Sequence, residues 1–205
     1  MRAAFINTLI KEAKKNDKIM LLTADLGFTV FEEFIDKFPN RFMNVGVAEQ
    51  NLMGVATGLA LSGKIVFAYS IATFATMRAF EQIRTDVASH NAHVIVVGSG
   101  GGLSYGHDSI THHGTEDIHL MRGIPGMTVL SPADPYETIW ATKVCVRLKK
   151  PAYLRLGKKG EPILYEKPTK LTLGKGSIFR NGKDIVILAT GNIVAFALEA
   201  AKILS

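Results

Sequence analysis

Glu49 draws attention first, because it opens a run of residues that is otherwise apolar, small or uncharged. Residues 48–61 read AEQNLMGVATGLAL, and Glu49 carries the only charge among them. A helix of this composition is buried on most of its surface, and an ionised carboxylate is seldom buried without a partner. The acid either satisfies the free N–H groups at the start of the helix or faces a nitrogen atom of a ligand.

Titratable residues are also concentrated in residues 106–117, which read GHDSITHHGTED. This stretch holds three of the six histidines together with three acids. Constrained loops of this kind tend to carry function. Histidine and aspartate can also bind a metal ion. However, His112 and His113 are adjacent, and no spaced pair such as H-x-x-x-H accompanies them, so the pattern favours a functional loop over a metal site.

A third group consists of Phe74, Met77 and Phe80, which follow the apolar run 65–69 at intervals of three residues. Residues spaced in this way share one face of a helix. That face either packs into the core or lines an apolar pocket. The glycine cluster at 98–102 lacks the G-x-G-x-x-G spacing, and the chain has no G-x-x-x-x-G-K-[ST] loop, so neither nucleotide motif is present.

The elements that must position these groups alternate between short apolar runs and longer helical patterns. We expect strands at residues 18–24, 42–45, 65–69, 93–97, 128–130 and 152–156, and helices at residues 3–15, 28–38, 49–61, 73–90, 117–122 and 135–148. This alternation predicts an α/β fold, an open and mostly parallel sheet with helices on both faces. Ligands bind at the carboxyl ends of the strands in such sheets, where the three groups fall.

The composition changes after a first domain, which we expect over residues 1–157. Residues 158–183 are rich in Lys, Gly and Pro, and predict a linker with a small hairpin or two. Residues 184–190 (DIVILAT) then predict a strand, and residues 191–204 a helix. One βα unit cannot bury a core alone, so residues 184–205 are expected to be the start of an incomplete second domain, through truncation or a natural split.

Bulk composition excludes several classes of protein. The 205 residues are 47% hydrophobic, carry a net charge of +6 and include one cysteine, Cys145, which excludes an internal disulfide and a cysteine-based metal site. No basic block interleaves with aromatic residues, so nucleic acid is not expected as a partner. No apolar run approaches the roughly 20 residues of a membrane span, and no signal peptide is visible, so we expect a cytoplasmic protein.

Taken together in order, the motifs resemble the pyrimidine-binding (Pyr) domain of the transketolase family of thiamine-diphosphate enzymes. The resemblance continues into the first βα unit of the C-terminal domain of that family and covers essentially the full length. Each motif is weak alone, and their common order and spacing carry the resemblance. The motifs are TADL at 23–26, NVGVAEQN at 44–51, TF with AFEQIR at 73–84, GHDSITH with ED at 106–117, and SPAD at 131–134.

The resemblance assigns roles to the residues near the cofactor. Glu49 matches the carboxylate that hydrogen-bonds N1′ of the aminopyrimidine, which helps to remove the thiazolium C2 proton and leads to a carbanion. Phe74 matches the ring that stacks on the pyrimidine. Met77 and Phe80 would complete the apolar pocket, and Asp25 matches a residue that lies near the cofactor.

On the substrate side, Asp108 and His112 match positions that hydrogen-bond the hydroxyls of the donor sugar and steer proton transfers. Two phosphate contacts of the family are altered. Gly100 aligns with a phosphate-binding histidine, and Lys158 aligns with an arginine, so that the charge is kept but the bidentate fork is lost. The alterations suggest a modified or non-phosphorylated sugar, or a specialised pathway.

The resemblance also implies a partner. The family grips the diphosphate and Mg²⁺ through a G-D-G…N motif on a separate domain, and this chain contains no Gly-Asp-Gly. The chain is therefore expected to supply half a site, with thiamine diphosphate shared at an interface and Mg²⁺ held by the partner and not by this chain. Apolar surface around the Glu49 helix also predicts self-association into a homo-oligomer such as a dimer.

The implied function is the transfer of a two-carbon ketol unit between sugars or sugar phosphates by a transketolase-like subunit or fragment, inactive without its partner. Two alternatives share the fold: 1-deoxyxylulose-5-phosphate synthase and the β-subunit of a 2-oxoacid dehydrogenase. The AFEQIR motif and the stretch from Asp108 to His112 favour transketolase. A non-catalytic assembly module is the alternative from another class, and the intact Glu49 argues against it.

Overall fold

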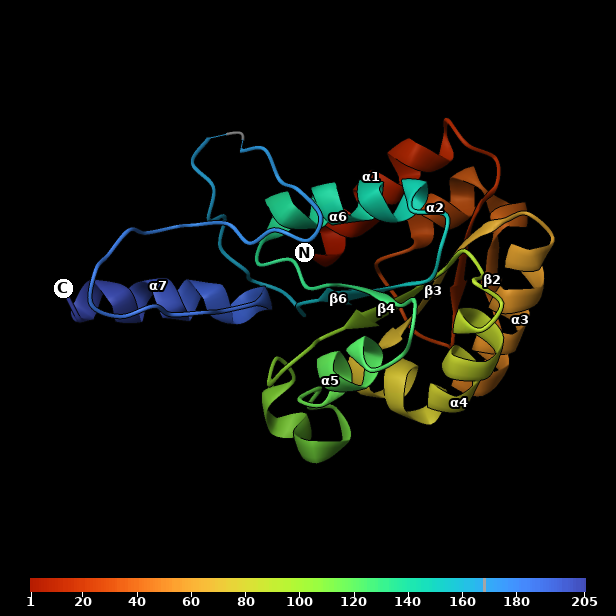
Figure 1. Ribbon diagram of the computed structural model, residues 1–205. Coiled ribbons are helices and arrows are strands. Elements are labelled where there is room, and N and C mark those ends of the chain that lie inside the picture. The colour runs from red at the N-terminus through yellow and green to blue at the C-terminus, as the bar shows by residue number, and fades with distance from the viewer. Residues whose placement is uncertain (168) are drawn as a thin grey trace.

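The computed structural model describes residues 1–167 and 169–205, and within them the strands form one six-stranded sheet (Figure 1). The strand order is β2-β1-β3-β4-β6-β5, and every neighbouring pair is parallel. The α/β prediction is therefore confirmed. The strands are β1 (Ile19–Thr23), β2 (Phe42–Asn44), β3 (Ile65–Ile71), β4 (Val94–Ser99), β5 (Thr128–Leu130) and β6 (Ala152–Leu156).

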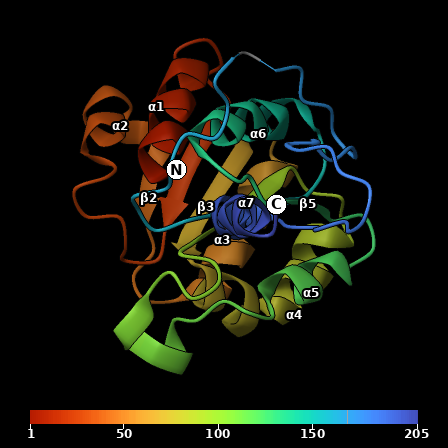
Figure 2. The same cartoon turned by 90° about the vertical axis from the view of Figure 1, so that its left-hand side faces the viewer.

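Helices cover both faces of this sheet (Figures 1 and 2). Successive residues of a strand point to opposite faces, so a strand buried on both sides reads as a continuous apolar run. In β1, Ile19 and Leu21 join one core cluster, and Met20 and Leu22 join the other. The first cluster lies under α1 (Arg2–Ala13), α2 (Glu32–Lys37) and α6 (Pro135–Arg147), and the second under α3 (Glu49–Leu61), α4 (Phe80–Gln82) and α5 (Asp117–Arg122).

The segment after β3 differs from the expected continuous helix at 73–90. It consists of a π-helical turn η2 (Phe74–Arg78), the short α4 and a second π-helical segment η3 (Ile83–Ala88). π-helical turns are rare, occur often at functional sites and have no simple sequence signature. This segment packs against both β3 and α3, so it lies beside the helix that begins at Glu49.

Helix α2 is shorter than the helix expected at 28–38. It begins at Glu32, because the preceding residues form a turn in which Gly27 and Thr29 have positive φ values of 92° and 64°. A Cβ atom on Gly27 would lie 2.0 Å from the ring of Phe31, so glycine lets this turn pack closely on the core.

The C-terminal segment forms its helix but not its strand. Helix α7 (Val194–Ile203), preceded by the short η5 (Gly191–Ile193), projects away from the sheet in Figure 1 and is seen end-on in Figure 2. Residues 184–190 form neither helix nor strand, which corrects the expected βα unit. A strand needs a neighbour for its backbone hydrogen bonds, and Ile185, Val186 and Leu188 are instead 75%, 82% and 91% exposed.

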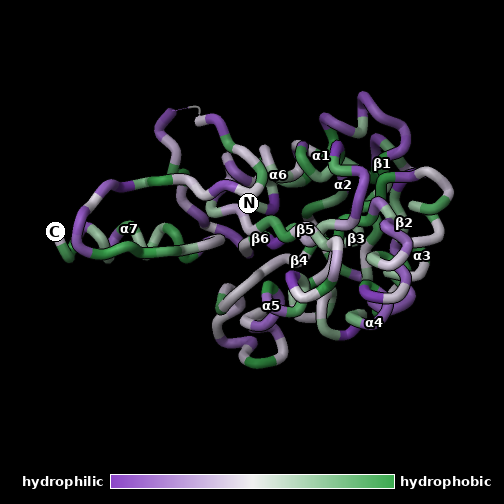
Figure 3. The backbone as a smooth tube through the Cα atoms, in the orientation of Figure 1, coloured by the Kyte–Doolittle hydropathy of each residue, from purple (hydrophilic) through white to green (hydrophobic). Residues whose placement is uncertain are grey.

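The linker also lacks the hairpin that its composition suggested, as far as residues 158–167 and 169–183 are concerned. Figure 3 shows hydrophobic residues along the central strands and again along α7, where much of the apolar surface is exposed. The division of the chain into a first domain, a linker and the start of a second domain remains a prediction.

Candidate functional site

The candidate residues gather at the edge of the sheet where four parallel strands end. Asp25 follows β1, Phe74 follows β3, the loop of residues 100–114 follows β4, and Lys158 follows β6. Carboxyl ends of parallel strands meet at one edge, which is where open α/β sheets bind ligands. The topology therefore brings together groups that lie far apart in the sequence.

Glu49 is the first residue of α3 and is only 4% exposed. Its Oε1 accepts a hydrogen bond from Ser70 Oγ at 3.3 Å, and its Oε2 accepts one from Arg78 Nη1 at 3.3 Å. Both donors are side chains of other elements, β3 and η2, so these contacts do not cap α3. Both distances are also long for hydrogen bonds, and each carboxylate oxygen has lone pairs to spare. The carboxylate can therefore accept a further or a better donor.

Arg78 connects this carboxylate to an aromatic ring. Its guanidinium carbon lies 3.8 Å from the centroid of the Phe74 ring, which is a cation–π contact. The turn η2 begins at Phe74 and ends at Arg78, so the contact lies within one π-helical turn. Sequence reasoning did not single out Arg78, although its position four residues after Phe74 on a helical segment was a usable signal.

The loop after β4 continues this row of contacts. The His112 ring lies 5.0 Å from the Phe74 ring and 5.1 Å from the Tyr105 ring, measured between centroids. Lys158 Nζ lies 4.2 Å from the centroid of the Tyr105 ring and 3.8 Å from Asp108 Oδ2. Both predicted substrate residues of the loop, and Lys158 with them, therefore lie in one series of contacts that starts at Glu49 and passes through Arg78 and Phe74.

Asp25, Met77 and Phe80, the other residues predicted to lie near the cofactor, have surroundings that differ from those of Phe74. Asp25 has a left-handed backbone, with φ of 54°, and its Oδ1 accepts a hydrogen bond from Asn44 Nδ2 at 3.0 Å. This pair ties the turn after β1 to the end of β2. Met77 is 36% exposed, and Phe80 packs against the core cluster beneath α3. A regular helix would place Phe74, Met77 and Phe80 on one face, but this segment is π-helical in part.

A buried ion pair anchors the loop of residues 100–114. Asp117, the first residue of α5, is fully buried, and its Oδ2 accepts hydrogen bonds from Tyr153 Oη at 2.5 Å and Arg155 Nε at 2.8 Å. Arg155 Nη2 also donates to the Gly114 carbonyl at 2.8 Å, and Gly114 pairs with Gly102 across the base of the loop. Burial, followed by the nearby charge of Asp117, raises the pKa of Tyr153 well above its ordinary value.

Two glycines of the cluster at 98–102 make room for neighbouring side chains. A Cβ atom on Gly101 would lie 2.5 Å from the guanidinium carbon of Arg155, and one on Gly100 would lie 1.9 Å from a ring carbon of Tyr105. Both contacts are too close for a side chain, so glycine makes room for these two groups. Arg155 was also missed from the sequence, although a charge within the buried strand β6 required a buried partner.

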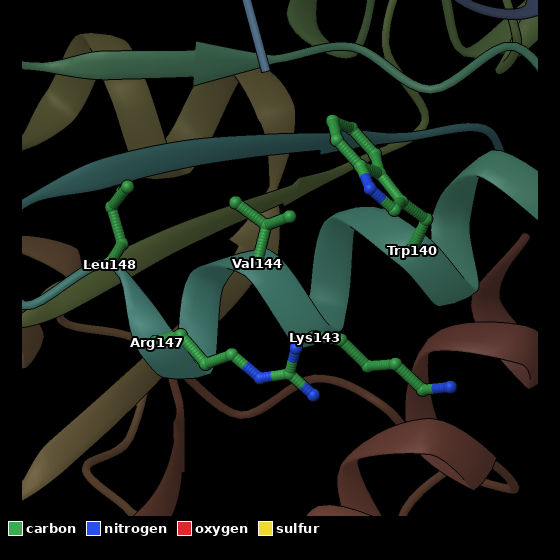
Figure 4. A pocket seen from close by; sticks show the side chains of 5 residues that line it. All are labelled: Trp140, Lys143, Val144, Arg147 and Leu148. Atoms are coloured by element: carbon green, nitrogen blue, oxygen red, sulfur yellow. The ribbon is translucent and has the colours of Figure 1, made fainter. Parts of the chain in front are cut away.

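Other regions offer less chemistry. A shallow pocket along α6 is lined by Trp140, Lys143, Val144, Arg147 and Leu148, as Figure 4 shows. Helix α6 covers the opposite face of the sheet from α3, and the lining contains no acid and no histidine. Over residues 1–167 and 169–205 there is no group of three or more His, Cys, Asp or Glu residues placed to hold a metal ion. None of the helices within the same ranges has the length and apolar character to cross a membrane.

Taken together, the contacts link a nearly buried carboxylate to an aromatic ring through the guanidinium of Arg78, with an imidazole and a lysine–aspartate pair further along the same edge. A carboxylate and an aromatic ring that contact one planar group can also hold a flat, nitrogen-containing ring by one hydrogen bond and by stacking. The imidazole can accept or donate a proton near such a ring.

Comparisons with known proteins found a matching family model and several similar chains. The family model of the transketolase pyrimidine-binding domain matches residues 1–161. A Methanocaldococcus jannaschii protein named as a transketolase C-terminal section is 43% identical, over 100% of this chain and 66% of its own length. The 6-deoxy-6-sulfo-D-fructose transketolase subunit of Clostridium sp. is 39% identical, over 98% of this chain and 63% of its own length.

A solved structure, described as a split-gene transketolase in an inactive β4 tetramer, superposes with a TM-score of 0.88. Its sequence is 40% identical, and the match covers 99% of this chain and 65% of the other. This chain thus spans 63–66% of the length of these relatives.

Proposed function

Because the chain belongs to the family of the transketolase pyrimidine-binding domain, we propose that it supplies the pyrimidine-binding half of a thiamine-diphosphate site. The proposed reaction is the transfer of a two-carbon ketol unit from a ketose to an aldose. One observation carries the proposal: the nearly buried carboxylate of Glu49 and the ring of Phe74 both contact one planar group, the guanidinium of Arg78.

These side chains fit an aminopyrimidine. The flat, N–H-bearing guanidinium of Arg78 lies 3.8 Å from the centroid of the Phe74 ring and contacts the Glu49 carboxylate at the same time, which supports this fit. An aminopyrimidine offers the same two features, a flat face and a ring nitrogen that hydrogen-bonds a carboxyl group. Glu49 also keeps acceptor capacity, since its two contacts are 3.3 Å long.

Each residue near the ring has a distinct proposed task. When bound, thiamine diphosphate supplies the carbon nucleophile that takes up the two-carbon unit. Glu49 shares a proton with the ring nitrogen N1′, and its burial strengthens that hydrogen bond because the surroundings are less polar than water. Ser70 holds the other carboxylate oxygen, and Phe74 orients the ring by stacking.

The substrate is proposed to bind along the row that continues from Phe74. His112 would hydrogen-bond donor hydroxyls and move protons near the reacting carbons, and Asp108 would bind a further hydroxyl. Lys158 sets the charge of the rim beside Asp108 but lacks the fork that grips a phosphate. This rim suits a modified sugar, and the relative from Clostridium sp. is named for one, 6-deoxy-6-sulfo-D-fructose.

The remainder of the site is proposed to lie on a partner subunit or domain that carries a G-D-G motif. That partner would hold the diphosphate and Mg²⁺, and this chain alone would be inactive. Two findings support a shared site: the chain contains no Gly-Asp-Gly, and its relatives are described as a split-gene transketolase and a transketolase subunit. The tetramer described for the solved relative supports a homo-oligomer of this chain as well.

The test is a reconstitution assay with thiamine diphosphate, Mg²⁺ and a ketose donor. The chain is assayed alone and after mixing with a G-D-G-bearing partner, and a mixture with the Glu49→Ala chain is the control. Ketol transfer in the complete mixture only is the expected result. A parallel assay with pyruvate as the donor tests the 1-deoxyxylulose-5-phosphate synthase alternative. Association of the two chains without turnover of a ketose would contradict the proposal.

A further inference from the structure

Arg78 holds both groups that the proposed function requires. Its guanidinium donates to Glu49 Oε2 at 3.3 Å and lies 3.8 Å from the centroid of the Phe74 ring. Because a single guanidinium makes both contacts, it covers the face of Phe74 that lies toward Glu49. The carboxylate and the aromatic face are thus already occupied within this chain.

A bound aminopyrimidine would need the same face and the same oxygen. The guanidinium is planar and presents its N–H groups in a rigid fork, so it resembles a flat, nitrogen-containing ring in shape and in hydrogen bonding. Two flat groups cannot stack on one face of one ring. Binding of a pyrimidine between Glu49 and Phe74 therefore requires Arg78 to move away.

Arg78 is free to make that movement, whereas Glu49 and its second donor, Ser70, are held in the interior. Its side chain is 50% exposed, whereas the side chain of Glu49 is 3% exposed and Ser70 is fully buried. On leaving, the guanidinium gains water, and the buried carboxylate exchanges one nitrogen donor for another. A long, charged side chain whose outer half already lies in water can turn away from its partner with little further rearrangement.

We propose that Arg78 is a displaceable substitute for the pyrimidine ring, which keeps Glu49 paired while the cofactor is absent and competes with the cofactor for the site. This inference rests on the proposed function. It identifies an autoinhibitory contact: every cofactor molecule that binds must first displace the guanidinium. The energy lost in that displacement lowers the apparent affinity for the cofactor.

The competition is tested with Arg78→Met in the reconstituted complex, by isothermal titration calorimetry with thiamine diphosphate and Mg²⁺. Removal of one cation–π contact and one half-exposed ion pair should tighten binding by about 3- to 30-fold. Arg84→Met is the matched control, because Arg84 is exposed on the next π-helical segment. The complex with Arg84→Met should bind thiamine diphosphate as tightly as the wild-type complex.

A second measurement needs no cofactor. In the chain alone, the Nε proton of Arg78 should show an upfield NMR shift from the ring current of Phe74, and Phe74→Leu should remove that shift. Addition of thiamine diphosphate and Mg²⁺ to the complex should return the proton to its solvent value. This experiment detects the substitute contact independently of enzymatic activity.

The outcomes separate the two proposals. If the wild-type complex binds the cofactor but Arg78→Met binds it equally or less tightly, the substitute role is overturned while the proposed function stands. An absent ring-current shift in the chain alone would overturn the substitute role as well. A wild-type complex that associates yet binds no thiamine diphosphate would overturn the proposed function, and this inference with it.

Discussion

Two carboxylates, Glu49 and Asp117, occupy similar places in the structure. Each is the first residue of a helix, and each is nearly or fully buried, with 4% and 0% of its surface exposed. They differ in their partners. Asp117 accepts hydrogen bonds of 2.5 and 2.8 Å from Tyr153 and Arg155, whereas the two contacts of Glu49 are both 3.3 Å long.

The partners differ in exposure as well. The Arg155 side chain is 10% exposed and also holds a backbone carbonyl, whereas the Arg78 side chain is 50% exposed. A buried guanidinium cannot be released without a large desolvation cost, but a half-exposed one can turn into water. Burial of an acid alone therefore does not distinguish the structural role of Asp117 from the role that we propose for Glu49. The freedom of its partner does.

The largest effect is expected for Asp117→Ala. Loss of this carboxylate leaves the charge of Arg155 buried and unpaired, which should lower the free energy of unfolding by about 3–5 kcal/mol. Urea unfolding followed by circular dichroism measures the change. Alanine at the neighbouring exposed acid, Glu116, is the control and should leave the unfolding curve close to that of the wild type. Equal unfolding curves for Asp117→Ala and Glu116→Ala would show that Asp117 is not a structural residue, and its contrast with Glu49 would be lost.

A smaller effect is expected for Arg155→Lys. Lysine keeps the charge but cannot bond both Asp117 and the Gly114 carbonyl, so the loop loses one anchor, and stability should fall by about 1–3 kcal/mol. Limited proteolysis should also cut residues 100–114 faster. Arg147→Lys on the outer side of α6 is the matched control. Unchanged cleavage of the loop would show that Arg155 does not anchor it.

The pH dependence of stability should report on the Asp117 side. Burial raises the pKa of Tyr153 above the ordinary tyrosine value of about 10, so the unfolded chain loses this proton at a lower pH than the folded chain. The contribution of Tyr153 to the free energy of unfolding is therefore complete below about pH 10. Above that pH it falls, by at most about 1.4 kcal/mol per pH unit. The stability advantage of the wild type over Tyr153→Phe should shrink between about pH 9 and about pH 11. A constant difference would contradict the prediction.

The smallest effect on stability is expected for Glu49→Gln. Arg78 is half exposed and regains water when its partner loses the charge, so the free energy of unfolding should change by less than about 1 kcal/mol. Measured beside Asp117→Ala under the same conditions, this variant sharpens the contrast. A loss as large as that of Asp117→Ala would mean that Glu49 is a structural residue.

Much of this molecule could be predicted from the sequence, because local patterns determine it. The apolar runs gave the strands, and the amphipathic segments gave most of the helices. Glu49 and the loop with Asp108 and His112 were visible as charges and titratable groups in unusual surroundings. The topology then brings these residues together, since the carboxyl ends of parallel strands share one edge.

The remainder depends on contacts that no local pattern encodes. Separation of Met77 and Phe80 from the Phe74 contacts follows from the π-helical turns, which have no simple sequence signature. The strand expected at 184–190 is absent, because its apolar residues have no neighbouring strand to pair with. Arg78 and Arg155 bond residues distant in the sequence, and only the tertiary structure shows which of the two is free to move.

The most direct test of the central claim, that the Glu49 carboxylate serves the cofactor, is the exchange of the cofactor C2 proton for deuterium. The exchange rate is measured by NMR in the reconstituted complex at saturating thiamine diphosphate, for the wild type, Glu49→Gln and the exposed control Glu81→Gln. We predict that Glu49→Gln slows exchange by about 100- to 10,000-fold, the range typical of a lost general acid–base residue, while Glu81→Gln leaves it unchanged. A wild-type exchange rate in Glu49→Gln would contradict the account.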